Sequence, residues 1–330
     1  MGGERSTLGP VRLRLRPARR HPIVFAGSAS PGLARAVCAD LGVEPARGET
    51  LRFSEGTLFV RVLDNVRGRD VYVIQSTGYP TNDNFVELLF WIDALKRASA
   101  SSVTAVVPYF GYGKGDKKDE PRVAIRARVC ADAIEAAGVD RIVAMDLHAP
   151  QIQGFFSGPV DDLYAMPYLI EALRRRKLSE PVVVAPDAGF AKRARRFARR
   201  IGAPVAIADK ERTAHDERAT VVELIGDVRG RDAVLVDDIV LSGSTLVEAA
   251  HALREHGARR ILAAVTHGVF SGGAEVIDAS PIEVVLCTDT IERRSDAVSS
   301  KIDVVSVAPL FAEAIRRIDR RESVSSLFQE

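Results

Sequence analysis

Short apolar runs rich in β-branched residues alternate with amphipathic helical patterns along nearly the whole chain. The runs end in polar residues or glycine, as buried parallel strands do. This alternation predicts an α/β fold in which a mainly parallel sheet has helices on both faces. The strands are expected at residues 21–27, 68–77, 103–110, 141–147, 181–187, 204–209, 232–239 and 261–269, with helices such as 84–98 and 244–258 between them.

A weak internal repeat indicates that this fold occurs twice. The segment RGRDVYVIQST begins at Arg67, and RGRDAVLVDDI begins at Arg229. After each segment a Val-Glu pair, at Val86 and at Val247, opens a helical pattern, and another apolar strand follows. Because the order of elements matches as well as the letters, we expect a duplicated α/β domain.

The length and composition are those of a two-domain globular protein. The 330 residues are too many for one typical core, while 46% apolar and 27% charged residues are ordinary values. We expect one domain over residues 21–165 and a second over 166–330, divided near the turn residues of 158–169. Ligands of such sheets bind beyond the carboxyl ends of the strands, so two facing domains would enclose a cleft.

Charge and cysteine content exclude several classes of function. The 46 Lys and Arg residues nearly balance the 44 Asp and Glu residues, which gives no overall attraction to nucleic acid or membrane. No apolar run is long enough to span a membrane. Cys38, Cys130 and Cys287 lie far apart in apolar stretches, which favours buried thiols in a reducing compartment.

Two basic segments are expected to face solvent. Residues 1–20 lack the apolar centre of a signal peptide, so we expect a disordered extension and a cytoplasmic location, with binding to an acidic partner as the alternative. Five arginines between Arg193 and Arg200 form a basic helix without interleaved aromatic residues. This pattern predicts a solvated helix face rather than a nucleic-acid surface.

The segment VLVDDIVLSGSTL, residues 234–246, places two adjacent carboxylates at the end of an apolar strand. The unpaired N–H groups and dipole of the helix that follows suit a phosphate, and a glycine lets the backbone come close. The carboxylates would repel that anion unless they bind sugar hydroxyls or Mg²⁺. The segment therefore predicts a site for a phosphorylated sugar, with simple helix capping as the weaker alternative. The binding residues would be Asp237, Asp238, Ser242, Gly243, Ser244 and Thr245.

This loop resembles the ribose-binding loop of the type I phosphoribosyltransferases and of their relatives, the phosphoribosyl-diphosphate (PRPP) synthases or ribose-phosphate diphosphokinases. DLHAPQIQGFF, residues 146–156, is similar to the synthase signature nearly letter for letter. Further similar segments are FVELLFWIDALKRASASSVTAVVPYFGYG, VVAPDAGFAKRAR, PLFAEAIRRI and ESVSSLF, so the resemblance runs from about His21 to Phe328. It implies two phosphoribosyltransferase-like domains that transfer the diphosphoryl group of ATP to the 1-hydroxyl of ribose 5-phosphate, giving PRPP and AMP.

The resemblance also implies catalytic and metal-binding residues. Lys210 and Arg212 match the catalytic lysine and arginine of a loop that closes over bound substrates. His148 matches a ligand of metal-bound ATP, and Asp187 matches a residue near Mg²⁺ and the sugar hydroxyls. A helix N-cap is the alternative role of Asp187. Mg²⁺ is the implied cofactor, because catalysis must neutralise two anionic substrates.

The nucleotide side departs from the family pattern. Lys114 and Gly115 stand where most relatives have arginine and then glutamine, and a lysine cannot both stack on a base and fork onto phosphate. In the family, a neighbouring subunit completes the nucleotide site with a second segment; in the matching segment here Phe53 is kept and Thr57 replaces an expected glutamate. The implied nucleotide-binding residues are Phe53, Glu55, Lys114, Asp119 and His148.

The resemblance leaves the partners and two alternatives to be tested. ATP and ribose 5-phosphate are the expected substrates, without nucleic acid or membrane. A nucleotide site shared between subunits implies a homo-oligomer. The smallest such assembly is a dimer, and the resemblance also fits a hexamer. One alternative is a PRPP-consuming phosphoribosyltransferase. The other is a non-catalytic or altered-nucleotide paralogue that regulates a true synthase, which Lys114, Gly115 and Thr57 keep open.

Overall fold

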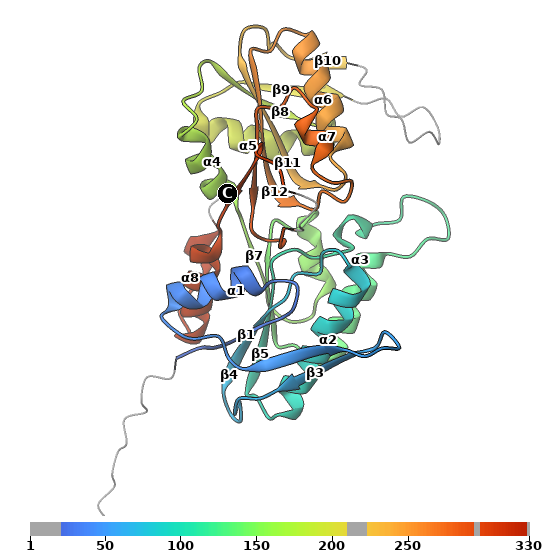
Figure 1. Ribbon diagram of the computed structural model, residues 1–330, viewed down its shortest axis with the longest axis vertical. Coiled ribbons are helices and arrows are strands. Elements are labelled where there is room, and N and C mark those ends of the chain that lie inside the picture. Colours follow the sequence, from blue (N-terminus) through green and yellow to red (C-terminus); the bar gives the residue numbers. More distant parts are fainter. Residues whose placement is uncertain (1–20, 210–222, 294–297, 329–330) are drawn as a thin grey trace, which may run out of the picture.

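The computed structural model describes residues 21–209, 223–293 and 298–328. They form two α/β lobes stacked along the long axis of the molecule (Figure 1). The N-terminal lobe contains a five-stranded parallel sheet in the order β1-β4-β5-β6-β7. Its strands are β1 (Ile23–Ala26), β4 (Asp70–Ile74), β5 (Ser102–Val107), β6 (Arg141–Met145) and β7 (Val160–Leu163).

Helices and one hairpin surround this first sheet. The hairpin pairs β2 (Gly48–Arg52) with β3 (Leu58–Val62) in antiparallel register and packs on α2. The helices are α1 (Pro31–Leu41), α2 (Thr81–Arg97) and α3 (Arg126–Ala136). Local sequence explains their limits: α1 begins at a proline, which lacks only an N–H that would be unpaired there, and ends before Gly42 in the left-handed conformation.

The C-terminal lobe contains a seven-stranded sheet in the order β10-β9-β8-β11-β12-β13-β14. All of its pairs are parallel except β10 with β9. The α/β class with two mainly parallel sheets is therefore confirmed. The strands are β8 (Pro181–Ala185), β9 (Val205–Asp209), β10 (Glu223–Ile225), β11 (Asp232–Val240), β12 (Arg260–Gly268), β13 (Val284–Thr288) and β14 (Ile302–Val305), and the helices are α4 (Met166–Arg174), α5 (Ala191–Ile201), α6 (Ser244–Glu255) and α7 (Glu275–Asp278).

The last helix, α8 (Ala308–Asp319), returns to the N-terminal lobe and packs against α1 (Figure 1). Arg316 on α8 donates a hydrogen bond of 2.9 Å to the carbonyl oxygen of Asp40 on α1. The division of the chain into domains between residues 165 and 166 stays a prediction. Helix α8 comes after this point in the sequence but packs on the N-terminal lobe.

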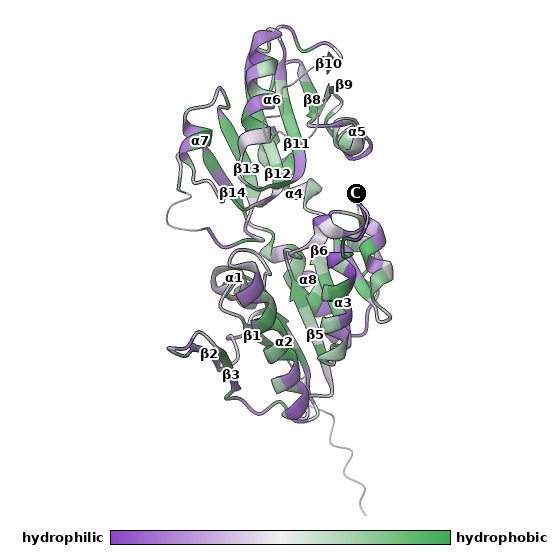
Figure 2. Ribbon diagram, turned by 90° about the vertical axis from the view of Figure 1, so that its right-hand side faces the viewer, coloured by the Kyte–Doolittle hydropathy of each residue, from purple (hydrophilic) through white to green (hydrophobic). Residues whose placement is uncertain are grey.

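Apolar side chains form three buried clusters. One lies in the N-terminal lobe and a second in the C-terminal lobe, whereas the third joins residues of both lobes, including Val24, Leu262 and Phe311. Figure 2 shows largely hydrophobic strands between helices that carry hydrophilic residues on their outer sides. Cys38, Cys130 and Cys287 are buried and unpaired, as expected. In the described part of the chain, no helix is both long and apolar enough to cross a bilayer.

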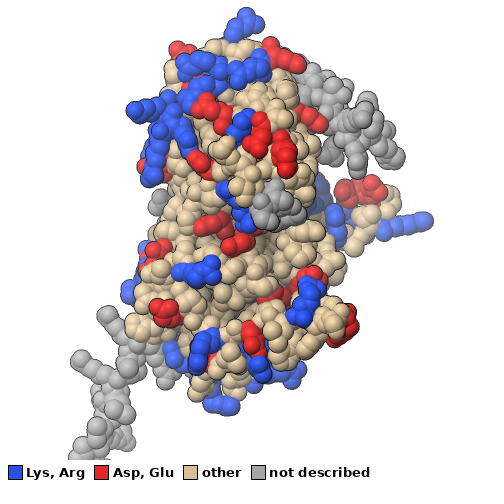
Figure 3. Space-filling view, in the orientation of Figure 1, with Lys and Arg blue, Asp and Glu red and all other residues tan. Residues whose placement is uncertain are grey.

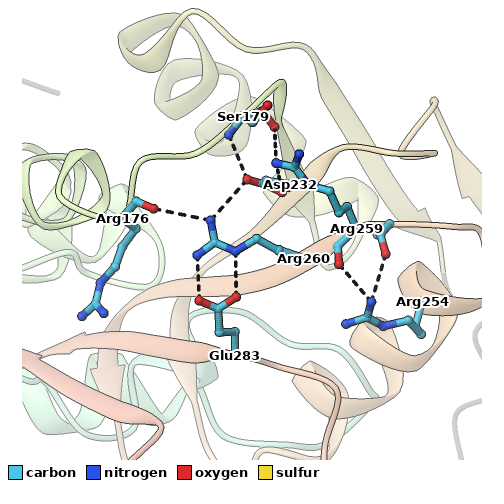
Figure 4. A network of polar contacts seen from close by, with 8 residues as sticks. Arg176, Ser179, Asp232, Arg254, Arg259, Arg260 and Glu283 are labelled. Atoms are coloured by element: carbon cyan, nitrogen blue, oxygen red, sulfur yellow. Dashed lines mark hydrogen bonds and ion pairs between the residues drawn. The ribbon is translucent and has the colours of Figure 1, made fainter.

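A polar network closes the amino ends of the second sheet (Figure 4). Asp232, the first residue of β11, is fully buried, and its carboxylate accepts hydrogen bonds from the Ser179 amide (2.8 Å) and Arg259 Nη2 (2.7 Å). Arg260 lies within 3.5 Å of the same carboxylate and forms two 2.7 Å bonds with Glu283. These charges satisfy one another at the edge of the sheet remote from the cleft, so they serve the fold.

Candidate active site

A cleft of about 1000 Å³ opens between the two lobes. Its N-terminal side carries Lys114 and His148, which follow β5 and β6, and its C-terminal side carries residues that follow β8 and β11. The carboxyl ends of parallel strands in both lobes thus face one cavity, as the duplicated fold predicts. Side chains of Asp116, Lys117 and Gln151, which sequence analysis did not single out, also line it.

Asp238 joins the two sides of the cleft. Its carboxylate is only 4% exposed and lies 2.7 Å from Nδ1 of His148, which belongs to the other lobe. Arg193 Nη1 approaches the same Asp238 oxygen at 3.4 Å. Asp237 precedes it, and Asp237 Oδ1 accepts a 2.8 Å hydrogen bond from the Asp238 amide. The contact between His148 and Asp238 brings together residues that sequence analysis assigned to the nucleotide and to the ribose.

The two adjacent aspartates have opposite pKa shifts. Burial and the charge of Asp238 raise the pKa of Asp237 well above its usual range. Burial would also raise the pKa of Asp238, but the hydrogen bond and charge of His148, followed by the charge of Arg193, outweigh it and lower the pKa. The raised pKa favours a proton on Asp237, which would remove the repulsion between the two adjacent carboxylates.

The predicted phosphate loop joins β11 to α6. Gly243 has φ 93°, a left-handed conformation that side chains rarely adopt, and α6 begins at the next residue. Ser242, Gly243 and Thr245 line the cleft, and Ser244 Oγ lies 3.0 Å from Ser242 Oγ. The first amides of α6 have no partner within the helix, so they and the helix dipole can bind an anion here.

The prediction of a fully solvated helix at residues 193–200 is wrong for Arg193. Arg193 Nη2 donates to the carbonyl oxygens of Leu147 (2.7 Å) and His148 (3.2 Å), and its guanidinium lies 5.7 Å from the ring centre of Phe190. Arg195 and Arg199 are exposed. Figure 3 shows that basic and acidic side chains both lie on the surface of the upper lobe. The spacing of residues along the helix could have predicted this position. Arg193 lies four residues before the buried Phe197 and hence on the same, inner face.

Asp187 follows β8 and lines the cleft. Its Oδ1 accepts a 2.9 Å hydrogen bond from the Phe190 amide, so the N-cap alternative is present in the structure. The second carboxylate oxygen leaves room for the metal or sugar role that the family resemblance implies. Both roles can therefore be filled by this side chain.

Other predicted residues lie apart from the cleft or outside the described chain. Phe53 is 46% exposed and follows β2, close to the tip of the hairpin with Glu55. A hydrogen bond from Thr57 lowers the pKa of Glu55. Asp119 is exposed on the loop before α3 and does not line the cleft. The predicted catalytic residues Lys210 and Arg212 lie outside the described residues.

Comparison with known proteins gives the same result from sequence and from structure. The model of the N-terminal domain of ribose phosphate pyrophosphokinase matches residues 22–138, and the phosphoribosyl synthetase-associated domain matches residues 213–329. The chain is 50% identical over 307 residues to a ribose-phosphate pyrophosphokinase of Caldanaerobacter subterraneus subsp. tengcongensis, covering 92% of this chain and 97% of that one. It is 47% identical over 311 residues to that of Ralstonia nicotianae, covering 93% and 98%.

A solved structure is similar over the same extent. It is the phosphoribosylpyrophosphate synthetase from Mycobacterium smegmatis, which aligns with a TM-score of 0.85 at 37% identity. The alignment covers 92% of this chain and 100% of the other. The likeness thus includes both lobes and their connection, not one domain alone.

Proposed function

This chain belongs to the ribose-phosphate pyrophosphokinase family, and we propose that it transfers the β,γ-diphosphoryl group of ATP to the 1-hydroxyl of ribose 5-phosphate. The 1-hydroxyl oxygen bonds to the β-phosphorus as the bond between that phosphorus and the α,β-bridging oxygen breaks. The hydroxyl proton is released to water, and PRPP and AMP are the products. The contact of 2.7 Å between His148 and Asp238 carries this proposal, because it brings the nucleotide side and the ribose side of one cleft together.

Ribose 5-phosphate is proposed to bind along β11 and the start of α6. The 5-phosphate would lie on the loop 242–245, against the first amides of the helix. Asp238, ionised, would accept hydrogen bonds from the vicinal sugar hydroxyls, while Asp237, protonated, would avoid a second charge near the phosphate. This pair and loop account for a phosphorylated sugar better than for helix capping, because the loop opens into the cleft.

Positioning and positive charge are the proposed sources of catalysis. His148 and Arg193 are held at the boundary of the lobes by Asp238, close to where the triphosphate must meet the sugar. Lys114 lines the same cleft on the nucleotide side. From the family resemblance we also propose that Lys210 and Arg212 contact the diphosphoryl group during its transfer, from the loop that carries them.

Mg²⁺ is the proposed cofactor. In the parts of the chain that the structure describes, no three acidic, histidine or cysteine residues lie close enough together to bind one metal ion. The carboxylate of Asp187, which lines the cleft, fits Mg²⁺, because this ion commonly uses one or two carboxylates together with substrate phosphates and water. Asp187 would supply an oxygen, and His148 would supply Nε2 in the neutral form of its ring, with Nδ1–H donating to Asp238; the ion would neutralise charge on the phosphates.

A homo-oligomer is proposed because the β2–β3 hairpin has an apolar outer face. Leu51, Phe53 and Phe59 are 38–46% exposed, and the rings of Phe53 and Phe59 lie 6.0 Å apart. A second copy of this chain would cover them and receive Phe53 in its nucleotide site. Phe53→Ala together with Phe59→Ala should shift the sedimentation of the protein to smaller species, and unchanged sedimentation would contradict this interface.

One assay tests the function. Purified protein is mixed with ribose 5-phosphate, Mg²⁺ and a panel of nucleoside triphosphates, and release of nucleoside monophosphate is measured with and without the sugar. AMP that forms only with ribose 5-phosphate supports the proposal. PRPP consumption with a free base would instead indicate a phosphoribosyltransferase. Absence of both reactions, with activity gained on adding a second synthase, would indicate a regulatory paralogue. We also propose a cytoplasmic location, in keeping with ATP and ribose 5-phosphate as the proposed substrates.

A further inference from the structure

His267 is a buried histidine that the proposed chemistry does not use. It lies near the carboxyl end of β12, is 3% exposed, and makes contacts on three sides. Its Nε2 is 3.1 Å from the carbonyl oxygen of Met145, in the other lobe, and its Nδ1 is 2.9 Å from Thr290 Oγ1. The ring of Tyr109, also from the other lobe, lies 4.9 Å from the imidazole ring.

These contacts determine the tautomer of His267. A carbonyl oxygen can only accept, so Nε2 must carry the proton that is donated to Met145. Nδ1 is then an acceptor and receives a hydrogen bond from the hydroxyl group of Thr290. Burial lowers the pKa of His267 to about 4, so the neutral ring that this pattern needs is present at physiological pH.

The residue before His267 makes a second bond across the same boundary. Thr266 Oγ1 donates to Asp146 Oδ2 at 2.7 Å, and Asp146 also accepts the Ala165 amide at 3.0 Å. Two consecutive residues of β12 are therefore bonded to two consecutive residues at the end of β6. The bond of His267 is buried and that of Thr266 is partly buried, so both have few competing partners in solvent.

These bonds lie immediately beside the contact that forms the site. His148 comes three residues after Met145, and Asp238 lies on β11, which pairs with β12 so that Ile239 is opposite His267. The end of β6 carries His148, and β12 supports the strand that carries Asp238. A displacement of Met145 relative to His267 would thus change the separation of His148 and Asp238.

We propose that His267 is a positioning residue for diphosphoryl transfer, which holds the nucleotide side of the cleft in register with the ribose side. This inference rests on the proposed function of the cleft. His267 acts through the backbone of Met145 and touches no substrate. The ribose loop lies entirely in the C-terminal lobe, so binding of the sugar alone does not need this bond, whereas the transfer step does.

His267→Phe is the main test, because it keeps a ring beside Tyr109 and removes both hydrogen bonds. We expect kcat to fall at least about 10-fold, since a misplacement of about 1 Å at a reacting centre can cost about 100-fold. The Kd for ribose 5-phosphate, measured by calorimetry, should change less than about 3-fold. His267→Gln, whose amide nitrogen can reach the Met145 carbonyl, should recover much of kcat.

Ser280→Ala is the matched control. Ser280 is buried in the same lobe, donates to the Ile277 carbonyl (2.7 Å) and accepts from the Ile282 amide (3.2 Å). The alanine variant therefore also loses two buried hydrogen bonds. It should lower the melting temperature without lowering kcat. Thr266→Val, which removes only the bond to Asp146, provides a second test variant if His267→Phe does not fold.

Hydrogen exchange provides a readout that does not depend on activity. The amides of residues 145–149 should exchange faster in His267→Phe than in the wild type, and not in Ser280→Ala. A wild type without activity would refute the proposed function, while the exchange rates would still decide whether His267 holds the end of β6. A kcat in His267→Phe within 2-fold of wild type, or an equal loss of kcat in Ser280→Ala, would overturn the proposal.

Discussion

At the scale of single residues, the environment separates two chemically identical side chains. Asp237 and Asp238 are neighbours in the sequence, yet only Asp238 contacts His148 and Arg193. The pattern of an apolar strand followed by two carboxylates was visible in the sequence and predicted a sugar site. The partner that keeps Asp238 charged lies 90 positions away along the chain, so no local pattern could assign the two protonation states.

The two asparagine variants of this pair should therefore differ. Asp237→Asn resembles the protonated acid already favoured at this position, and we expect the Kd for ribose 5-phosphate to change less than about 3-fold. Asp238→Asn removes the charge that faces His148 and Arg193, and it should weaken binding at least about 10-fold, as expected for a charged hydrogen-bond partner. Calorimetric titration of both variants measures this difference, and equal losses would contradict the assignment.

Asp162 should make the stability of the protein depend on pH. Its Oδ2 is buried without a hydrogen-bond partner among the described residues, and burial, followed by the charge of Asp146, raises its pKa to about 7. The folded state then binds a proton that the unfolded state has released above about pH 4. The free energy of unfolding should accordingly fall as pH rises from about 4 to 7, by up to about 3–4 kcal/mol.

Asp162→Asn removes this titration. Urea unfolding at pH 5 and pH 8 should show a smaller difference in the free energy of unfolding for the variant than for the wild type. Some slope of the same sign should persist, because burial also raises the pKa of Asp146. A variant that keeps the full difference between pH 5 and pH 8 would show that Asp162 is ionised in the folded protein.

At the scale of elements, a buried carboxylate attaches the β2–β3 hairpin to the N-terminal lobe. Glu87 on α2 is 1% exposed and accepts hydrogen bonds from the Ser28 amide (2.8 Å) and hydroxyl, Thr50 Oγ1 (2.7 Å) and Trp91 Nε1 (3.1 Å). Thr50 belongs to β2, so this one side chain joins the loop after β1, the hairpin and α2. All four contacts are with donors, which an ionised carboxylate satisfies.

Glu87→Gln should destabilise this connection. Glutamine can keep its oxygen on the three donors that meet Oε1, but these bonds lose their charge and the amide nitrogen replaces the oxygen that accepts from the Ser28 hydroxyl, at a cost of about 1–2 kcal/mol in the free energy of unfolding. Brief proteolysis should cut residues 48–62 faster in the variant than in the wild type. Glu49→Gln is the control, because Glu49 is on the same hairpin and, within the described part of the chain, is paired with Arg61 alone. Equal cleavage of both variants would contradict this role of Glu87.

The elements themselves were largely predictable, and the exceptions have physical causes. The continuous apolar run of β11 and the proline at the start of α1 are local signals that the structure follows. Arg193 was misjudged because its residue type outweighed its position in the helix. The spacing from Phe197 indicates its inward position. Its partners include carbonyl groups of the other lobe, which residue spacing along one helix does not reveal.

At the scale of the whole molecule, the chain crosses the boundary between its lobes at the C-terminus as well as at residues 158–169. The apolar face of α8 predicts that the helix is buried, but its sequence does not state against which sheet. The structure places it on α1, so residues more than 260 positions apart share one core. The interlobe bonds of His267 and Thr266 have the same long-range character.

This shared core predicts that both lobes unfold together. Phe311 on α8 is fully buried in the apolar cluster that contains residues of both lobes. Removing its ring should lower the free energy of unfolding by about 3–5 kcal/mol. Because the cluster includes Val24 of the first sheet and Leu262 of the second, the loss should reach both lobes.

Calorimetry and a matched variant decide this point. The wild type and Phe311→Ala should each show one transition, with the transition of the variant at lower temperature. Phe90→Ala removes the same ring from a side chain that is 42% exposed on α2, and it should shift the transition much less. Two resolved transitions, of which Phe311→Ala moves only one, would mean that the lobes are independent. The positions of His148 and Asp238 would then depend on interlobe bonds such as those of His267, Thr266 and Arg193, without support from the common core.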